Sequence, residues 1–262
     1  MALLRCTLMD EPNRYPVKAT RTSFALIEIL ATDGPLGVTN VTTRMDATKG
    51  TVHNHLTTLR SLGYVKKIDG RYDLTLRALA TGERTRERSN LFRVAKPYLD
   101  NLSKTTGEWV GLFIEEEGRG TRVYHAVSSG TWSPPSVDGD QLPLHATAAG
   151  KAILASMPDQ RVEECVRRHG LPARTPQTIT DRETLDAQLR SVRGDGVAYC
   201  REERIEGVNG VAAPVRSNED EREGAISVVG RAEVLNGRRF EEDITGQVLS
   251  TAKQVELELR SD

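Results

Sequence analysis

The sequence contains few cysteines, no long apolar run and almost no net charge. Its 262 residues include only Cys6, Cys165 and Cys200, which cannot build a disulfide framework and fit a reducing compartment. A membrane-spanning helix needs about 20 predominantly apolar residues, and no run in the sequence approaches that length. The first residues also lack the apolar segment and cleavage site of a signal peptide. We therefore expect a cytoplasmic protein with no membrane partner.

The short motifs of common enzyme families are missing as well. The sequence has no G-x-S-x-G, no Walker phosphate loop and no H-E-x-x-H. Cys165 and His169 stand four residues apart, a spacing that places metal ligands on one helix face. Further ligands could be sought only among His125, His145 and Cys200. We predict no catalytic residue, no metal and no cofactor.

The composition that is present fits a folded protein with two differently charged parts. Hydrophobic residues make up 37% and charged residues 28% of the chain, and 262 residues are enough for two domains. Residues 1–105 hold 17 Lys and Arg against 10 Asp and Glu, whereas residues 106–262 hold 19 against 27. A basic first part joined to an acidic remainder is typical of a chain whose first third meets a polyanion.

The stretch from Met45 to Thr75 carries the most informative pattern. One face of a predicted helix over residues 48–62 is apolar, with Val52, Leu56 and Leu59 at helical spacing. The opposite face is small, polar and uncharged, and comprises Gly50, Asn54, Thr57 and Ser61, flanked by His53 and Thr58. Solvated helix faces usually carry Lys and Glu, whereas short donors and acceptors suit the edges of bases in a DNA groove.

A β-hairpin is predicted directly after this helix. Gly63 ends the helix, and Asp69-Gly70 between two short apolar runs is a strong hairpin signal. Lys66, Lys67 and Arg71 would place positive charge at the tip, as in a wing that lies near phosphates. Each of these cations could equally be a plain solvated charge. A helical subdomain closed by a hairpin, without any ligand, is the alternative for the whole stretch.

The preceding segments complete a helix-turn-helix. Residues 18–31 form a predicted helix with Phe24, Ile27 and Leu30 on one face, ended by Gly34-Pro35. Residues 38–45 are interpreted as a short supporting helix. The turn at residues 46–48 then leads to the second helix, with Thr48 as its N-cap.

The rest of the chain predicts an α+β domain. Residues 77–89 are charged and turn-rich, and an apolar stripe resumes at Leu91 and runs past Pro97, which indicates a linker helix that could pair with its twin in a dimer. Strands are predicted at 109–115, 122–127, 197–200, 210–215 and 225–230, and helices at 146–156, 159–169, after the capping box Thr180–Glu183, and at the C-terminus. This mixture favours an antiparallel sheet with helices.

These segments resemble a known family. TVHNHLTTLRSLGYV and GRYDLT resemble the winged helix-turn-helix of the IclR family of transcriptional regulators, and LPLHATAAGKAILA resembles its C-terminal signature. EERIEGVNGVAAPV and GAISVVGRA resemble later segments of the same family. The resemblance implies a winged helix-turn-helix (17–80), a linker helix (81–105) and a GAF-like effector-binding domain with an antiparallel sheet (106–262). Residues 1–16 have two prolines and no periodicity, so we expect a flexible arm there. It also implies dimers or tetramers, small organic acids or aromatic compounds as effectors, and either repression or activation.

The expected DNA contacts follow from position in the predicted helix and hairpin. In the recognition helix they are Lys49, Thr51, His53, Asn54 and Thr58, and in the wing Lys66, Lys67 and Arg71. Asn54 stands where the family often has Arg, and because Asn pairs with adenine better than with guanine, we expect a preference for A there. His55 lies nearer the apolar stripe, so we favour packing over base contact for it.

Expected effector-binding positions begin at the Ala-rich helix. Thr147, Ala148, Ala149 and Gly150 open it, and free N–H groups at a helix N-terminus can bind an anion, although small residues there could instead serve close packing. The resemblance adds Arg201, Gly210, Ser227 and Val229. The family often has small polar residues at the positions of Gly210 and Val229. Their absence here leaves fewer hydrogen-bond donors, so the effector could be less polar. Alternatively, Arg201 could bind a carboxylate through two hydrogen bonds. His145 is expected to be structural, at the mouth of the pocket.

Three functions remain compatible with this pattern. The first is a homo-oligomeric transcriptional regulator that binds double-stranded DNA and responds to a small-molecule effector. The second is an architectural DNA-binding protein whose second domain only oligomerises. The third, an enzyme with a DNA-binding arm, is disfavoured by the missing motifs.

Overall fold

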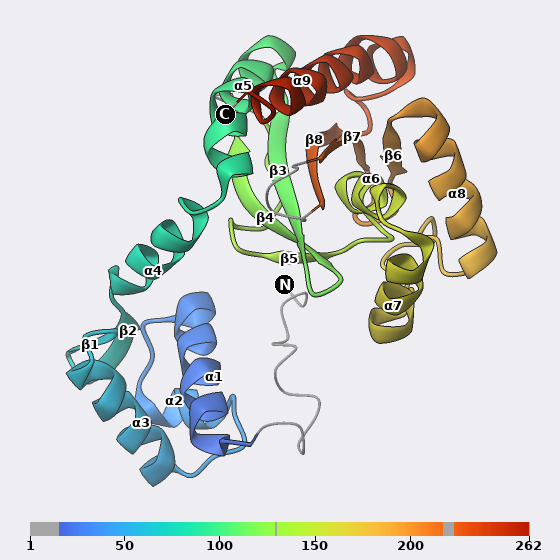
Figure 1. Ribbon diagram of the computed structural model, residues 1–262. Helices are drawn as coiled ribbons and strands as arrows, with labels where there is room; N and C mark the ends of the chain where they lie inside the picture. The colour runs from blue at the N-terminus through green and yellow to red at the C-terminus, as the bar shows by residue number, and fades with distance from the viewer. Residues whose placement is uncertain (1–15, 129, 217–222, 262) are drawn as a thin grey trace. The chain divides into compact units, whose positions relative to one another are not determined.

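The computed structural model describes residues 16–128, 130–216 and 223–261 (Figure 1). Two compact units divide the chain, one up to Thr85 and one from Arg86 onward. Helices and antiparallel strands occur in both units, which confirms the predicted α+β class. The predicted N-terminal arm falls outside the described residues except for Pro16. Within the described ranges, no helix is both long and apolar enough to cross a membrane.

The first unit is the predicted winged helix-turn-helix. It consists of α1 (Lys18–Asp33), α2 (Val38–Thr42), α3 (Lys49–Ser61), β1 (Val65–Ile68) and β2 (Arg71–Leu74). A small core of Leu26, Leu30, Val41, Val52, Leu56, Leu59, Val65 and Tyr72 holds these elements together. The prediction for α1 was wrong in one position, because Phe24 is 55% exposed and the buried face is formed by Ala25, Leu26 and Leu30.

The predicted linker helix is two helices in the structure. α4 (Arg77–Arg86) has no buried residue along its whole described length, whereas α5 (Asn90–Thr106) buries most of one face. Ser89 separates them, since its hydroxyl accepts a hydrogen bond from the Phe92 N–H and caps α5. α5 therefore belongs to the core of the second unit, and only α4 crosses the boundary between the units.

The second unit is a six-stranded antiparallel sheet covered by helices on both faces (Figure 1). The strand order is β5-β4-β3-β8-β7-β6. The strands are β3 (Trp109–Glu116), β4 (Arg119–Ala126), β5 (Gln141–Pro143), β6 (Ala198–Arg201), β7 (Val208–Arg216) and β8 (Glu223–Arg231). The other elements are α6 (Ala148–Ser156), α7 (Asp159–His169), α8 (Arg182–Asp195), the π-helix η2 (Arg239–Ile244) and α9 (Thr245–Glu258).

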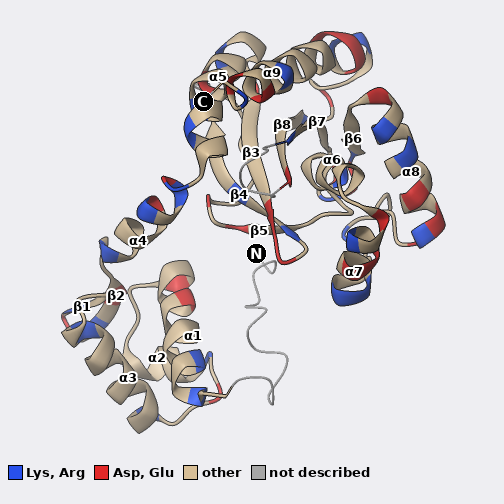
Figure 2. Ribbon diagram, in the orientation of Figure 1, with Lys and Arg blue, Asp and Glu red and all other residues tan. Residues whose placement is uncertain are grey.

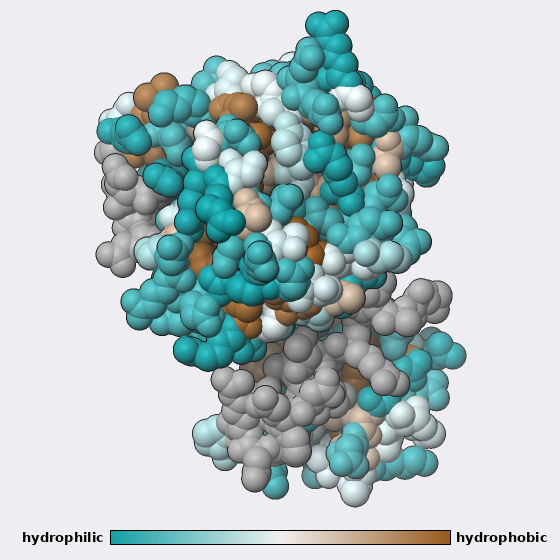
Figure 3. All heavy atoms as spheres, turned by 90° about the vertical axis from the view of Figure 1, so that its right-hand side faces the viewer, coloured by the Kyte–Doolittle hydropathy of each residue, from teal (hydrophilic) through white to brown (hydrophobic). Residues whose placement is uncertain are grey.

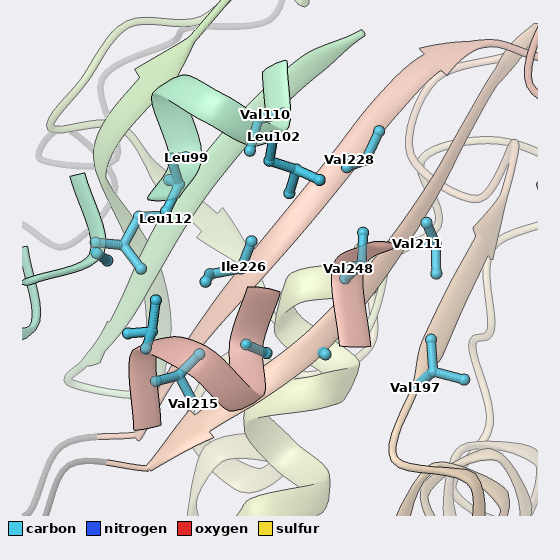
Figure 4. Packing of buried hydrophobic residues seen from close by; sticks show 14 of the residues in the cluster. Leu99, Leu102, Val110, Leu112, Val197, Val211, Val215, Ile226, Val228 and Val248 are labelled. Carbon is cyan, nitrogen blue, oxygen red and sulfur yellow. The ribbon is translucent and has the colours of Figure 1, made fainter. Parts of the chain in front are cut away.

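Two apolar cores lie on opposite faces of this sheet. On one face Leu99 of α5 and Val248 of α9 pack on alternate strand residues, among them Leu112, Val211 and Ile226 (Figure 4). On the other face α6, α7 and α8 cover a core that includes Trp109, Phe113, Ile153, Leu185 and Ala212. The outer surface around α7 and α8 is mostly hydrophilic (Figure 3).

Several elements differ from the sequence-based prediction. β4 starts at Arg119, because Glu117 and Gly118 alone form the turn, with φ of 55° and 79°. β5 was not predicted at all. α8 is capped by Asp181, whose carboxylate accepts the Thr184 N–H at 2.8 Å, one residue later than the predicted capping box required.

Candidate nucleic-acid interface and ligand pocket

The outer face of α3 is exposed, as predicted. Val52, Leu56 and Leu59 are buried and fix the rotation of the helix, while Thr48 caps it by accepting the Thr51 N–H. The five predicted contact residues of the helix all reach solvent: Lys49, Thr51, His53, Asn54 and Thr58. In Figure 2 this helix is mostly neutral, unlike α7 and α8.

The polar side chains of the outer α3 face differ in whether they are free to form hydrogen bonds with another molecule. Thr58 donates its hydroxyl hydrogen to the Asn54 carbonyl at 3.0 Å, so it offers an outside partner lone pairs and a methyl group. Neither Asn54 nor His53 uses its side chain in a hydrogen bond to any described residue. An unengaged amide can present both a donor and an acceptor, which is the combination that an adenine edge requires.

His55 has a packing role, as predicted. Its Nδ1 lies 2.8 Å from the Ser23 hydroxyl and the ring is half-buried between α3 and α1. This hydrogen bond joins α3 to α1, so His55 helps to hold α3 in place on the side that faces α1.

The wing exists, but its three cations are not equivalent. Asp69 and Gly70 form the hairpin turn with positive φ, and the register pairs Lys66 with Asp73. The same two side chains form an ion pair of 3.2 Å, and Lys67 lies 5.1 Å from the centre of the Tyr72 ring. Arg71 is exposed and has no ion-pair partner in the described part of the chain. Of the three predicted wing contacts, Arg71 is therefore the least engaged.

A ligand pocket opens in the second unit between the sheet and the N-terminus of α6. Its cavity volume is about 60 Å³, and most of its wall is apolar, including Trp109, Phe113 and Leu142. Six of the eight predicted effector-binding residues line it: Thr147, Ala148, Ala149, Gly210, Ser227 and Val229.

The structure places the other two predicted residues elsewhere. A Cβ atom on Gly150 would lie 2.2 Å from the Leu144 carbonyl oxygen, so this glycine serves close packing of α6 rather than ligand contact. Arg201 is exposed, pairs with Glu241 at 2.9 Å and lies over the rings of Tyr199 and Phe240. Because side chains alternate along a strand and Cys200 faces the pocket, Arg201 faces away from it.

Two arginines that the sequence did not single out line the pocket instead. Arg122 is 1% exposed, donates from Nε to Asp138 at 3.0 Å and from Nη1 to Ser136 at 2.7 Å, and lies over the Trp109 ring. Burial lowers the pKa of both Arg122 and Arg204 below the usual range of arginine. No local signal in the sequence distinguished Arg122, because the strand also carries Arg119, Thr121 and His125.

A buried ion pair holds the loop that carries Arg204. Lys151 donates to both carboxylate oxygens of Glu203 at 2.6 and 2.8 Å, and both residues are buried. The hydroxyls of Thr175 and Thr178 donate to the backbone carbonyls of Glu202 and Glu203. These bonds tie the loop to α6 and keep the Arg204 side chain at the pocket.

The remaining polar atoms of the pocket define what it can hold. Asn209 donates from Nδ2 to the Leu235 carbonyl at 2.9 Å, and its buried Oδ1 has no hydrogen-bond partner in the part of the chain that the structure describes. Burial raises the pKa of Cys200 to about 11, so this thiol stays neutral at physiological pH. Two guanidinium groups above apolar walls suit a small anion with an apolar part.

Relatives of this chain show its family. The sequence matches the IclR helix-turn-helix domain over residues 22–69 and the bacterial transcriptional regulator IclR C-terminal domain over residues 83–257. The chain belongs to the IclR family. It is 32% identical over 236 residues to the HTH-type transcriptional regulator Rv1719 of Mycobacterium tuberculosis, a match that covers 88% of each chain.

Solved IclR structures share the fold. The IclR of Thermotoga maritima has a TM-score of 0.77 at 24% identity and covers 92% of this chain and 98% of its own. An IclR homolog of Microbacterium hydrocarbonoxydans complexed with 4-hydroxybenzoate has a TM-score of 0.77 at 22% identity, with 93% and 100% covered. IclR proteins are transcriptional regulators with a DNA-binding helix-turn-helix and an effector-binding C-terminal domain, so this chain is a regulator and not an enzyme.

Other residues considered at the sequence level have structural roles in this IclR chain. His145 is buried and donates from Nε2 to the Pro172 carbonyl, but it lies beside a second cavity of about 40 Å³ and not at the mouth of the first. Cys165 and His169 pack against Gly118, and His169 donates to the Glu117 carbonyl at 2.7 Å. Among the described residues, no group of three or more potential ligands could hold a metal ion.

Proposed function

We propose that this chain is a homo-oligomeric regulator whose affinity for an operator changes when a small organic acid enters the pocket of the second unit. The observation that carries the proposal is the pair of arginines, Arg122 and Arg204, at a pocket with apolar walls. A guanidinium group binds a carboxylate through two parallel hydrogen bonds. The apolar wall would then receive the rest of the acid.

On the DNA side, the polar face of α3 would lie in a major groove and the wing near phosphates. Short side chains allow the helix backbone to approach base edges, and Asn54 is the side chain best suited to read one. Lys49, Thr51, His53 and Thr58 would flank it. Arg71 would contribute most to phosphate contact from the wing, with Lys66 and Lys67 assisting.

Cavity size limits the acid. A cavity of about 60 Å³ with mostly apolar walls suits a small acid. The Microbacterium homolog is complexed with 4-hydroxybenzoate, so an acid of that size is tested beside shorter ones.

Exposed apolar residues support the proposed oligomer. Leu76 is 86% exposed at the start of the segment between the units, and Leu79 on α4 is 58% exposed. These two water-exposed leucines, one directly before α4 and one on it, favour contact with a second copy, because contact would remove their apolar surface from water. A dimer would also supply the two recognition helices that a palindromic operator requires.

A thermal-shift panel tests the pocket. Pyruvate, glycolate, benzoate and 4-hydroxybenzoate are added to the full-length chain, each beside its uncharged amide. At 100 times its dissociation constant a ligand adds about 2.7 kcal/mol of stability, so a bound acid raises the melting temperature and its amide does so far less. A duplex enriched from a random pool by the same chain supplies the operator. Operator binding without a shift by any acid would favour the architectural alternative.

A further inference from the structure

One buried cation of the pocket is left incompletely bonded. Arg122 is 1% exposed, and its Nε and Nη1 have acceptors, but its Nη2 has none among the described residues. A buried donor without an acceptor costs free energy that a ligand oxygen in the pocket would recover. Because Arg122 lines the pocket, an acid bound there meets this guanidinium.

Asp138 contacts both Arg122 and the last residue of α4. Its Oδ1 accepts from Arg122 at 3.0 Å and from His125 at 2.8 Å, while its Oδ2 lies 3.5 Å from Nη1 of Arg86. Arg86 is the last residue of α4, and its guanidinium also contacts the Phe92 ring at 4.7 Å and the Val123 carbonyl. One carboxylate thus joins a pocket residue to the helix that crosses the unit boundary.

The pocket wall belongs to the same network. The His125 ring stacks on Trp109 with ring centres 5.9 Å apart and an interplanar angle of 13°. Trp109 lines the pocket, and the Arg122 guanidinium lies 5.2 Å from the centre of a Trp109 ring. A ligand that moves Arg122 or Trp109 therefore acts on two of the three partners of Asp138.

We infer that Arg122 receives the acidic group of the effector and that Asp138 transmits its arrival to Arg86 and so to α4. This inference rests on the proposed function, in which the pocket binds an acid. A second carboxylate at Arg122 competes with Asp138 for the same guanidinium. Asp138 then binds Arg86 and His125 more firmly, which changes how tightly the end of α4 is held.

A double-mutant cycle tests this relay without ligand or DNA. Amide hydrogen exchange of residues 77–86 is measured in the full-length chain and in Arg122→Met, Arg86→Met and the double variant. Removing Arg122 frees Asp138 for Arg86, so exchange in α4 slows by about fivefold or more. In the Arg86→Met background, which exchanges faster, the Arg122→Met effect disappears. Arg161→Met is the matched control, because it also removes an arginine that is paired with a buried carboxylate, that of Glu115. This variant should leave exchange in α4 unchanged.

Two conservative variants protect the test against misfolding. Asp138→Asn retains the size of the side chain and abolishes the effect of Arg122→Met, and Arg122→Lys retains the charge and shifts exchange in the same direction. Unchanged exchange in the Arg122 variants, or an undiminished Arg122→Met effect without Arg86, overturns the relay. Failure of every acid in the thermal-shift panel contradicts the proposed function instead, and the exchange cycle still decides on the relay.

Discussion

Asn54 is the residue of α3 with the most specific recognition chemistry. Its amide is exposed and makes no hydrogen bond to a described residue, and a bidentate contact to adenine discriminates by about 1–3 kcal/mol. Asn54→Ala should therefore reduce the preference for adenine at one operator position by about 5-fold to 150-fold. Fluorescence anisotropy against four duplexes that differ only at that base pair measures the change. An unchanged order of the four duplexes would rule out this contact.

Lys151 and Glu203 are a buried pair whose separation should be costly. Both carboxylate oxygens of Glu203 accept from Lys151, which is 1% exposed. Lys151→Met leaves a buried carboxylate without its cation and should lower the free energy of unfolding by about 3–5 kcal/mol. Urea denaturation measures this. The double variant Lys151→Met with Glu203→Leu should recover most of the loss, and an equally unstable double variant would contradict the explanation.

At the scale of elements, the local patterns predicted α3 and the wing well. Helical spacing of Val52, Leu56 and Leu59 and the Asp69-Gly70 turn act within a few residues, so the sequence alone was sufficient. The split between α4 and α5 was missed because it depends on the Ser89 cap and on what α5 buries. The charged and turn-forming residues of this segment do not show which core α5 packs against.

The residues of the pocket were also only partly predictable from local sequence patterns. The small residues at the start of α6 were predicted, because a helix start is a local feature. The choice between Arg201 and Arg122 depends on strand register, and a shift of one residue turns every side chain to the other face. Only the three-dimensional arrangement shows that Arg201 pairs with Glu241, outside the pocket.

Gly150 and Gly82 both lie in helices, but only Gly150 is required for close packing. A Cβ atom on Gly150 would meet the Leu144 backbone at 2.2 Å, whereas one on Gly82 in α4 would meet nothing within 4 Å. Gly150→Ala should destabilise the chain by about 1–3 kcal/mol through overpacking. Gly82→Ala should be neutral or stabilise α4 by up to about 1 kcal/mol. Thermal denaturation compares them, and a harmless Gly150→Ala would contradict the close packing of α6.

The wing is an element whose contribution is electrostatic. If Arg71 contacts a phosphate, Arg71→Gln should reduce the slope of log affinity against log salt by about 0.9 and leave base preference intact. Lys66→Gln should have a smaller effect, because Lys66 is already paired with Asp73. Lys96→Gln, a paired lysine of α5, serves as control. Equal slopes in Arg71→Gln and Lys96→Gln would exclude the wing contact.

The whole molecule joins a basic first unit to an acidic second unit. Residues 1–85 hold 12 Lys and Arg against 8 Asp and Glu, and residues 86–262 hold 24 against 29. The wing and the α3 face are in the basic unit. The buried cations of the second unit lie in an otherwise acidic part, where they suit an anion that enters a pocket and not a polyanion on a surface. This separation of charge assigns DNA to one unit and the effector to the other.

The affinity of the full-length chain for its selected operator, with and without the acid that raises the melting temperature most, tests the central claim directly. An effector that couples the two units should change the operator dissociation constant by about 5-fold to 150-fold, which corresponds to about 1–3 kcal/mol. Arg122→Met should abolish the response. An acid that saturates the pocket while operator affinity stays the same would contradict the account.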